Sequence, residues 1–397
     1  MPAIRSVFLS TYAPEECGLA CFTRDTADAV DLAAGRPVSS AVAIQKTRSL
    51  VGTDSRVKHV IDNHSPNAYQ KAAGEVNRGR FDVVSLQHEF GLYPGNWGSG
   101  ILHFLNECLK PIVTTFHTLQ KQPDSLPCRL IQKISERSQA VIVMTRTAAD
   151  LLRDVYGVCT SSINLIPHGV PSALFPRKPV HRQVLGLEGR KVICTFGLIN
   201  PGKGLEAMIK AMPKIVNQCH EAIYLIVGVT HPQVKRDSGE VYRNAQVKLA
   251  KSLGVSDNVR FFDQYLSLPQ LLSHLQASDV FVTPYPGKDQ IASGTMDYAM
   301  ASVGAVVSTP YLYAREVLAD GRGLLVPFGD SEAMDDSTLR FLCNERFSRQ
   351  TRRRAYAYAR PMFWPIVGRK YSDLFSSVFN QQFENRNVAA HMAAFGK

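Results

Sequence analysis

The chain has 397 residues, more than one hydrophobic core usually serves, so two domains of roughly 150 to 200 residues each are expected. Its hydrophobic content of 45% is ordinary for a soluble globular protein, and the absence of any run of about 18 apolar residues excludes a typical transmembrane helix. The net charge of +11 favours anionic partners such as nucleotides, although the excess is spread along the sequence.

The densest basic cluster is RQTRRRAYAYAR, residues 349–360, and it has helical character. Its interleaved tyrosines would suit a nucleic acid or a membrane surface, but no sustained amphipathic stripe accompanies them. A solvated helix face is therefore favoured. No nucleic-acid partner is expected, peripheral membrane contact is not indicated, and the oligomeric state is left open.

The first residues read as a strand and a turn rather than as a signal peptide. The eight cysteines lack CxxC spacing, and several lie in apolar, strand-like runs, which favours free thiols over disulfides. These features predict a cytoplasmic protein without a structural metal site.

Short apolar segments alternate with helical stretches along the chain, the pattern of two doubly wound α/β units. The strands expected in the first half are SVFLST, FDVVSLQHE, PIVTTFH, QAVIVMT and INLIPHG. Those expected in the second half are KVICTFG, AIYLIVG, NVRFFDQY, DVFVTPY, GAVVSTP and GLLVPFG. Between them, residues 170–190 contain three prolines and little periodicity, and they form the predicted linker.

Polar residues follow several strands of the first half. His88 and Glu89 come after VVSLQ, His117 after IVTTF, and His168 after NLIP. A single histidine at a strand end is often only a polar residue with its hydrogen bonds formed and no role in function. Ligands of open parallel sheets bind at the carboxyl ends of the strands, however, so the shared edge strengthens a functional interpretation.

The stretch GLINPGKG, residues 197–204, contains most of a phosphate-binding P-loop. Gly204 stands where a P-loop has the hydroxyl residue that coordinates magnesium, which disfavours a P-loop ATPase. Lys203 remains a candidate counter-charge for a diphosphate.

The segment DQIASGTMDYAMASVG, which begins at Asp289, places two acids eight residues apart around a Ser-Gly-Thr turn. Ser293, Gly294 or Thr295 can start a helix whose N–H groups attract a diphosphate. Asp297 then falls in the first helical turn. Taken alone, the segment also fits an ordinary capped helix in which this acid only complements the helix dipole.

These motifs, in this order, resemble those of the retaining glycosyltransferases of family 4 over most of the chain. FGLINPGKG is similar to the family's block that ends in Lys-Gly, and Asp289 and Asp297 match its paired-acid signature of Glu, seven residues and Glu. Further similar segments are AMASVGAVVSTP, REVLADGRGLLVPFGD, CGLACFTRD, TTFHT, LIPHGV and the closing helix FWPIVGRKYSDLF.

The resemblance implies the GT-B architecture, in which two facing Rossmann-like doubly wound domains hold the active site in the cleft between them. Residues 1–175 would form the acceptor-side domain, joined by a returning helix at about 361–380. Residues 190–360 would bind the nucleotide sugar, and 381–397 would form a flexible tail.

The resemblance also implies hexose transfer from a nucleoside diphosphate sugar to a hydroxyl of a carbohydrate or small molecule, with retained configuration. GDP-mannose or UDP-glucose is the favoured donor. No cofactor beyond the donor and no metal are expected, and the sequence has no DxD triplet. The implied catalytic residues are His117 at the reaction centre, Asp289 at the donor sugar and Lys203 at the diphosphate.

The helix-start motif, the strand-end positions and the resemblance together indicate further residues for each substrate. Those on the donor side, besides Lys203, are Gly18, Gly197, Ser293, Gly294, Thr295 and, at the ribose, Asp297. Those on the acceptor side are His88, Glu89 and His168.

The sequence departs from the family pattern in two ways. Leu198 stands where the family usually has Arg, so Arg315 and Arg322 are candidates for the missing charge. Both paired acids are Asp, which shortens each by one carbon–carbon bond, about 1.5 Å. An inactive sugar-nucleotide-binding protein, or a GT-B epimerase or phosphorylase, therefore remains an alternative.

Overall fold

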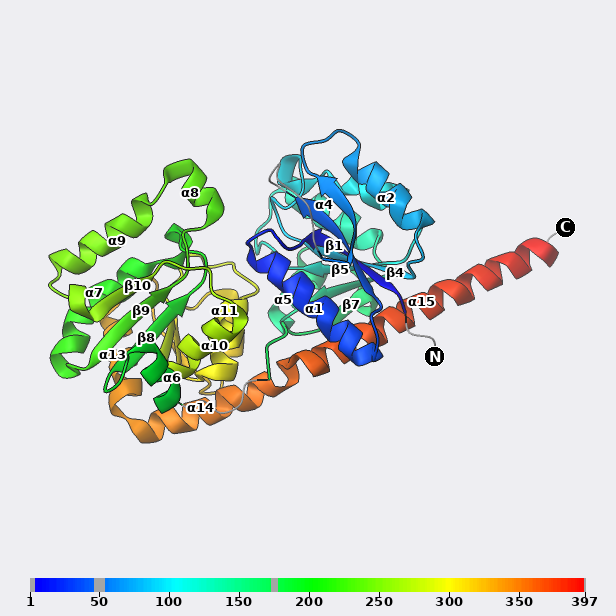
Figure 1. Ribbon diagram of the computed structural model, residues 1–397. Helices are drawn as coiled ribbons and strands as arrows, with labels where there is room; N and C mark the ends of the chain where they lie inside the picture. The colour runs from blue at the N-terminus through cyan, green and yellow to red at the C-terminus, as the bar shows by residue number, and fades with distance from the viewer. Residues whose placement is uncertain (1–3, 46–53, 173–177, 396–397) are drawn as a thin grey trace. The chain divides into compact units, whose positions relative to one another are not determined.

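The computed structural model describes residues 4–45, 54–172 and 178–395 (Figure 1). The chain divides into two compact units, Met1–Gly169 with Met362–Lys397, and Val170–Pro361. In Figure 1 each unit is a β-sheet with helices packed on both of its faces. Of the predicted linker, residues 170–190, residues 173–177 lie outside the described residues, and Lys178–Leu185 form helix α6 within it.

The first unit is built on a seven-stranded sheet with the order β3-β2-β1-β4-β5-β6-β7. Its strands are β1 (Ser6–Thr11), β2 (Ser39–Gln45), β3 (Val57–Asp62), β4 (Val83–His88), β5 (Ile112–Phe116), β6 (Ala140–Val143) and β7 (Ile163–Leu165). Its helices are α1 (Gly18–Ala34), α2 (Ala68–Arg78), η1 (Asn96–Gly98), α3 (Ile101–Glu107), α4 (Ser125–Glu136), α5 (Arg146–Asp154), η2 (Thr160–Ser162) and α15 (Trp364–Phe395).

The second unit is built on a six-stranded sheet with the order β10-β9-β8-β11-β12-β13. Its strands are β8 (Lys191–Phe196), β9 (Ala222–Val227), β10 (Val259–Phe262), β11 (Val280–Thr283), β12 (Val306–Ser308) and β13 (Leu324–Leu325). Besides α6, its helices are η3 (Pro201–Lys203), α7 (Leu205–Gln218), α8 (Pro232–Ser238), α9 (Val241–Ser252), η4 (Ser256–Asn258), α10 (Leu268–Ala277), α11 (Gly294–Ser302), α12 (Leu312–Val317), α13 (Ser331–Cys343), α14 (Glu345–Ala359) and η5 (Arg360–Met362).

All eleven strands predicted from the sequence are confirmed, while β2 and β3 were not predicted. Every strand pairing within the described residues is parallel. In each sheet the strand order reverses at one point, between β1 and β4 in the first unit and between β8 and β11 in the second. In open parallel sheets this reversal opens a crevice at the carboxyl ends of the strands, where ligands bind.

The central strands are buried on both faces, because helices cover both sides of each parallel sheet. All six residues of β1 and all six of β9 are buried. In the first unit Phe8 belongs to a core cluster that also contains residues from the far end of the chain, among them Tyr371 and Phe375 of α15. The returning C-terminal helix that the family resemblance implied therefore packs into the core of the first unit.

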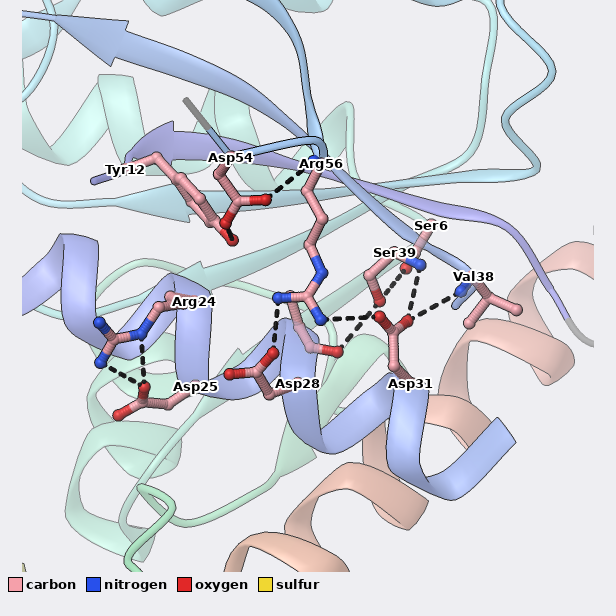
Figure 2. Close-up of polar contacts among 11 residues, drawn as sticks. Ser6, Tyr12, Arg24, Asp25, Asp28, Asp31, Val38, Ser39, Asp54 and Arg56 are labelled. Atoms are coloured by element: carbon pink, nitrogen blue, oxygen red, sulfur yellow. Dashed lines mark hydrogen bonds and ion pairs between the residues drawn. The ribbon is translucent and has the colours of Figure 1, made fainter. Parts of the chain in front are cut away.

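A polar network fastens α1 to the neighbouring strands (Figure 2). Arg56, at the start of β3, pairs with Asp28 at 2.5 Å and Asp31 at 3.0 Å, both on α1. Its backbone N–H donates to Asp54, which also accepts a hydrogen bond from the hydroxyl of Tyr12 beyond β1. The network fastens the second half of α1 to the chain segment that enters β3.

Helix α15 is helical through Phe395, including residues expected from the sequence to form a flexible tail, so the mobility of that tail stays a prediction. None of the helices among the described residues combines the length and the apolar character needed to cross a membrane.

Helix α15 lies against α1 at a point where only glycine fits. A Cβ atom on Gly368 would lie 2.2 Å from the carbonyl oxygen of Ala29. We therefore expect Gly368→Ala to lower the free energy of unfolding by about 1–3 kcal/mol, because the helices must move apart. The measurement is urea denaturation.

The matched control is Gly74→Ala in α2. A Cβ atom there would meet only the flexible end of Arg78, at 3.6 Å. We expect this change to stabilise the protein by up to about 1 kcal/mol, since alanine favours a helix over glycine. Equal effects of the two substitutions would contradict the close packing of α15 on α1.

Candidate active site

The loop after β8 brings Gly197, Lys203 and Thr295 together in the second unit. Gly197 has φ of +130°, and a Cβ atom there would lie 3.1 Å from Lys203 Nζ and 3.5 Å from Thr295 Cγ2. The glycine therefore permits both an unusual backbone conformation and the close approach of the lysine. Three of the residues that the sequence placed on the donor side thus lie side by side.

A tyrosine that the sequence analysis missed holds this lysine in place. Lys203 Nζ donates a 2.8 Å hydrogen bond to the hydroxyl of Tyr285 and lies 4.5 Å from the centre of its ring. The same hydroxyl is 3.0 Å from Thr295 Oγ1, which is 3.2 Å from Ser293 Oγ. A chain of hydroxyl groups thus links the ammonium to the start of α11. The sequence signal for Tyr285 was its position just after β11, at the point where the strand order reverses.

Helix α11 begins as predicted. Ser293 is the N-cap, and its hydroxyl accepts a hydrogen bond from the N–H of Met296 at 3.4 Å. The first N–H groups of a helix have no intrahelical acceptor and carry partial positive charge. Since Thr295 lies beside Lys203, the helix end and the ammonium present positive charge to the same place. This arrangement suits a diphosphate.

The two acids of the paired motif lie in different environments. Asp289 is exposed, in the loop between β11 and α11. Asp297 is in the first turn of α11, as predicted, but its side chain is fully buried, and the hydroxyl of Tyr313 lies 2.5 and 2.6 Å from its two oxygens. Burial raises the pKa of this carboxyl well above its usual value, despite the opposing effect of the Tyr313 hydrogen bond. A ribose could reach Asp297 only after Tyr313 moved, so that role stays a prediction.

The two arginines considered as substitutes for the missing charge at Leu198 have other partners. Arg322 donates to the carbonyl groups of Val317 and Glu316 at the end of α12, pairs with Asp320, and lies over a tyrosine ring. Arg315 Nε donates to the carbonyl oxygen of Pro310 at 2.7 Å. None of these contacts of Arg315 and Arg322 involves Lys203. Lys203 is therefore still the cation that lies next to the start of α11.

In the first unit His117 follows β5, as predicted from the sequence. Its Nε2 lies 2.9 Å from Gln87 Oε1, and its ring meets the edge of Phe22 with the centroids 4.8 Å apart. If Nε2–H donates to the Gln87 oxygen, Nδ1 is left as an acceptor. Burial, with smaller contributions from His168 and His88, lowers the pKa of His117 to about 3, so its ring is neutral at physiological pH.

His168 lies in the same cluster. Its Nδ1 is 2.7 Å from the carbonyl oxygen of Gly169, and its ring centroid is 5.0 Å from that of Phe22 and 6.1 Å from that of Trp364. Burial lowers its pKa to about 4. Phe22, on the second turn of α1, thus brings together two histidines that are 51 positions apart in the sequence. Its part in the cluster was not predicted.

His88 is a core residue, although the sequence grouped it with the acceptor side. Its side chain has no exposed surface, and its ring lies among those of Phe90, Tyr93 and Phe116, with centroids 5.4 to 6.2 Å away. Burial lowers its pKa to about 3. It therefore cannot touch a bound acceptor in this conformation, because its side chain is fully buried. The neighbouring Glu89 is exposed.

Gly18 is the first residue of α1, and Cys17 is its N-cap. A Cβ atom on Gly18 would meet no other atom within 4 Å. The space beside it is open, as a backbone approached by a ligand requires, although the space would also admit a side chain.

Comparisons with known proteins show the family and the fold of the chain. The second unit matches the family described as "Glycosyl transferases group 1" over residues 177–361, and the first matches "Glycosyltransferase Family 4" over residues 39–174. The chain is 26% identical to a phosphatidyl-myo-inositol mannosyltransferase of Mycolicibacterium smegmatis over 317 residues, which cover 79% of this chain and 75% of the relative.

Two solved structures show the same fold. The sucrose-phosphate synthase of Thermosynechococcus elongatus has a TM-score of 0.76 at 18% identity, covering 95% of this chain and 99% of its own. Anabaena Alr3699/HepE in complex with UDP and glucose has a TM-score of 0.72 at 16% identity, covering 94% and 100%. The chain belongs to the group 1 and family 4 glycosyltransferases and has the GT-B fold. Binding of a nucleotide-sugar donor follows from membership of this family.

The buried position of His88 predicts a pH-dependent stability. Its pKa is lower in the folded protein than in the unfolded chain, so the unfolded chain takes up a proton as the pH falls below about 6.5 and stability is lost. Between pH 7 and pH 5 this residue should account for a loss of about 2 kcal/mol.

The measurement is the free energy of unfolding at both pH values for the parent and for His88→Leu. The difference between the two pH values should be about 2 kcal/mol smaller in the variant. His103→Leu, at an exposed site on α3, is the control and should behave like the parent. An unchanged pH dependence in His88→Leu would refute the buried, neutral state of this ring.

The contact between Asp297 and Tyr313 predicts different effects on stability for two substitutions. Tyr313→Phe leaves a buried carboxyl without its donor and should cost about 1–3 kcal/mol. Asp297→Asn should be nearly neutral at pH 7, because a buried acid with a raised pKa loses stability as the pH rises and an amide does not. Thermal unfolding at pH 6 and pH 8 measures both effects. A larger loss in Asp297→Asn than in Tyr313→Phe would show that the carboxylate itself is required.

Proposed function

We propose that the protein transfers a hexose from a nucleoside diphosphate sugar to a hydroxyl of a carbohydrate or small-molecule acceptor, with retained anomeric configuration and without an essential metal. The observation that carries the proposal is the Lys203–Tyr285–Thr295 chain at the start of α11, with the exposed Asp289 in the preceding loop.

The second unit offers what a departing diphosphate needs. Negative charge develops on the leaving group in the transition state, and donors already fixed in position stabilise it without reorganisation. Tyr285 holds Lys203, and the Ser293 cap fixes the first turn of α11. Each well-placed donor of this kind typically contributes about 3 to 4 kcal/mol. These groups supply positive charge for which many transferases use a divalent ion.

The remaining roles follow from exposure and charge. Asp289 can accept hydrogen bonds from hydroxyls of the donor sugar, because its carboxylate is exposed beside the helix start. His117 can hold an acceptor hydroxyl through a neutral ring, since its pKa is about 3. His168 and Glu89 lie at the same sheet edge and are proposed as neighbours of the acceptor. The buried ring of His88 supports this sheet edge from the core of the unit.

The donor is proposed to be GDP-mannose or UDP-glucose. A mannosyl group is named for the M. smegmatis relative, and UDP and glucose are named for the complex of similar fold. The loop region Gln87–Trp97, which is rich in aromatic residues, is proposed to shape the acceptor pocket. Its Phe90 and Trp97 rings pack with centroids 5.3 Å apart, and Trp97 remains 37% exposed, which suits stacking on a sugar.

A second candidate is a sugar-nucleotide-binding protein without transferase activity. Leu198 in place of Arg and the burial of Asp297 favour it, because both reduce the polar contacts available to a donor. Formation of a glycosidic product at enzymatic rates would exclude this candidate, and it would also separate a transferase from an epimerase.

The proposal predicts selective binding of one nucleotide family. The test is the melting temperature of the protein with UDP, GDP, ADP, UDP-glucose or GDP-mannose, each with and without EDTA, and with ATP plus magnesium. Because a ligand that binds only the folded state raises its stability, the matching nucleotide at 100 times its Kd should add about 2.7 kcal/mol. The shift should persist in EDTA. A response to ATP with magnesium alone, or to no nucleotide, would contradict the proposal.

Asp289→Ala should abolish transfer without loss of folding, because the side chain is exposed and contributes to no core. Lys203→Met should lower kcat by about 100-fold to 1000-fold, the usual cost of removing one charge-stabilising donor. Initial rates of nucleotide release measure both. Asp257→Ala, an exposed aspartate in η4 of the same unit, is the control and should retain full activity. Equal activity of Asp289→Ala and the parent would refute the role of Asp289.

A further inference from the structure

A solvent-open surface cavity of about 630 Å³ lies in the second unit and is lined in part by Lys288, in the loop that carries Asp289. Its charged lining residues are Lys288 and Arg315, and its apolar wall is formed by Pro310 and residues 325–328. No carboxylate lines it within the described part of the chain. The volume is in the range of small-molecule sites, and the two cations make it selective for a negative charge.

Three hydrogen bonds fix the elements that line the cavity. Arg315 Nε donates to the carbonyl oxygen of Pro310 at 2.7 Å, which orients the guanidinium and leaves its terminal N–H groups for a ligand. The carbonyl of Lys288 accepts a hydrogen bond from the N–H of Leu312 at 3.1 Å, and Val326 N–H donates to Ser308 at 2.9 Å. The loop is thereby tied to α12, and the segment after β13 is tied to β12.

The two cations are available to a ligand. Lys288 Nζ lies 5.9 Å from the centre of the Phe328 ring, and both Lys288 and Arg315 are exposed. Across residues 4–45, 54–172 and 178–395, neither side chain forms an ion pair with a carboxylate. A planar guanidinium can bind a phosphate or carboxylate with two parallel hydrogen bonds.

The position of the cavity distinguishes it from the diphosphate site. Lys203 contacts Tyr285 and Thr295 at the start of α11, whereas Lys288 is the neighbour of Asp289, the residue proposed for the donor sugar. Arg315, considered from the sequence as a partner of the diphosphate, lines the cavity with Lys288 instead. A ligand group here would lie toward the sugar being transferred. The apolar wall with Phe328 suits the C–H face of a sugar ring.

We propose that Lys288 and Arg315 bind an anionic substituent, a phosphate or a carboxylate, on a sugar substrate. This inference rests on the proposed transferase function and narrows its substrate class to charged carbohydrates. The anionic group belongs either to the acceptor, as in a sugar phosphate, or to the transferred sugar, as in a uronic acid. The chemistry of recognition is the same for both.

The experiment measures binding by isothermal titration calorimetry for three proteins. They are the parent, the double variant Lys288→Gln/Arg315→Gln, and the control Lys248→Gln/Arg353→Gln, which removes the same charge from exposed sites of the same unit. One set of ligands is glucose 6-phosphate and mannose 6-phosphate, each against its neutral sugar. The other is UDP-glucuronate against UDP-glucose.

For the parent and the control, we expect the charged member of at least one pair to bind at least about tenfold more tightly than the neutral member, because it gains charge-assisted hydrogen bonds. The double variant should lose that preference. Loss in the sugar-phosphate pairs places the charge on the acceptor, and loss in the UDP pair places it on the donor sugar. No preference in the parent, or a double variant equal to the control, overturns the inference.

Binding of UDP and GDP to the same proteins separates this inference from the proposed function. Both nucleotides should bind the double variant as they bind the parent, since Lys203 is unchanged. If neither nucleotide binds the parent, the proposed function fails, while the sugar-phosphate pairs still test the cavity.

Discussion

The constraint on which the site depends is that the strands pair only in parallel. The carboxyl ends of parallel strands all lie at one edge of the sheet. The strand order reverses between the paired strands β8 and β11, so the two loops that follow these strands border one crevice. One loop carries Lys203 and the other carries Tyr285 and Asp289. Residues more than 80 positions apart therefore meet beside the start of α11. The first unit repeats the arrangement around β1 and β4.

Sequence patterns predicted most of this framework, because buried parallel strands read as continuous apolar runs and helix caps have local chemistry. The two strands that were not predicted, β2 and β3, differ from this apolar pattern for physical reasons. β2 is buried but rich in small residues. β3 is an edge strand with a single neighbour, and five of its six residues keep at least part of their surface exposed. Ser293 at the cap of α11 was predictable, since capping depends on adjacent residues. The partnership of Tyr285 with Lys203 was not, because it depends on distant segments.

The paired acids Asp289 and Asp297 show the same limit of prediction from the sequence. Their spacing suggested two similar ligands for one nucleotide sugar, yet one carboxyl is exposed and the other is buried beneath Tyr313. A buried acid is costly when charged, and its raised pKa together with the tyrosine hydrogen bond reduces that cost. The contact also ties the first turn of α11 to α12. Asp297 can thus support the donor site by holding the helix start in place, which is the rigidity that electrostatic stabilisation of a leaving group requires.

The central claim is that this chain is a retaining transferase, and the anomeric configuration of its product tests that claim most directly. The protein would be supplied with the donor that stabilises it, in α configuration, together with an acceptor, and the new linkage would be assigned by NMR before the product can equilibrate. The account predicts an α-linked product. A β-linked product would contradict it, because that product forms from an α-linked donor only by inversion at the anomeric carbon.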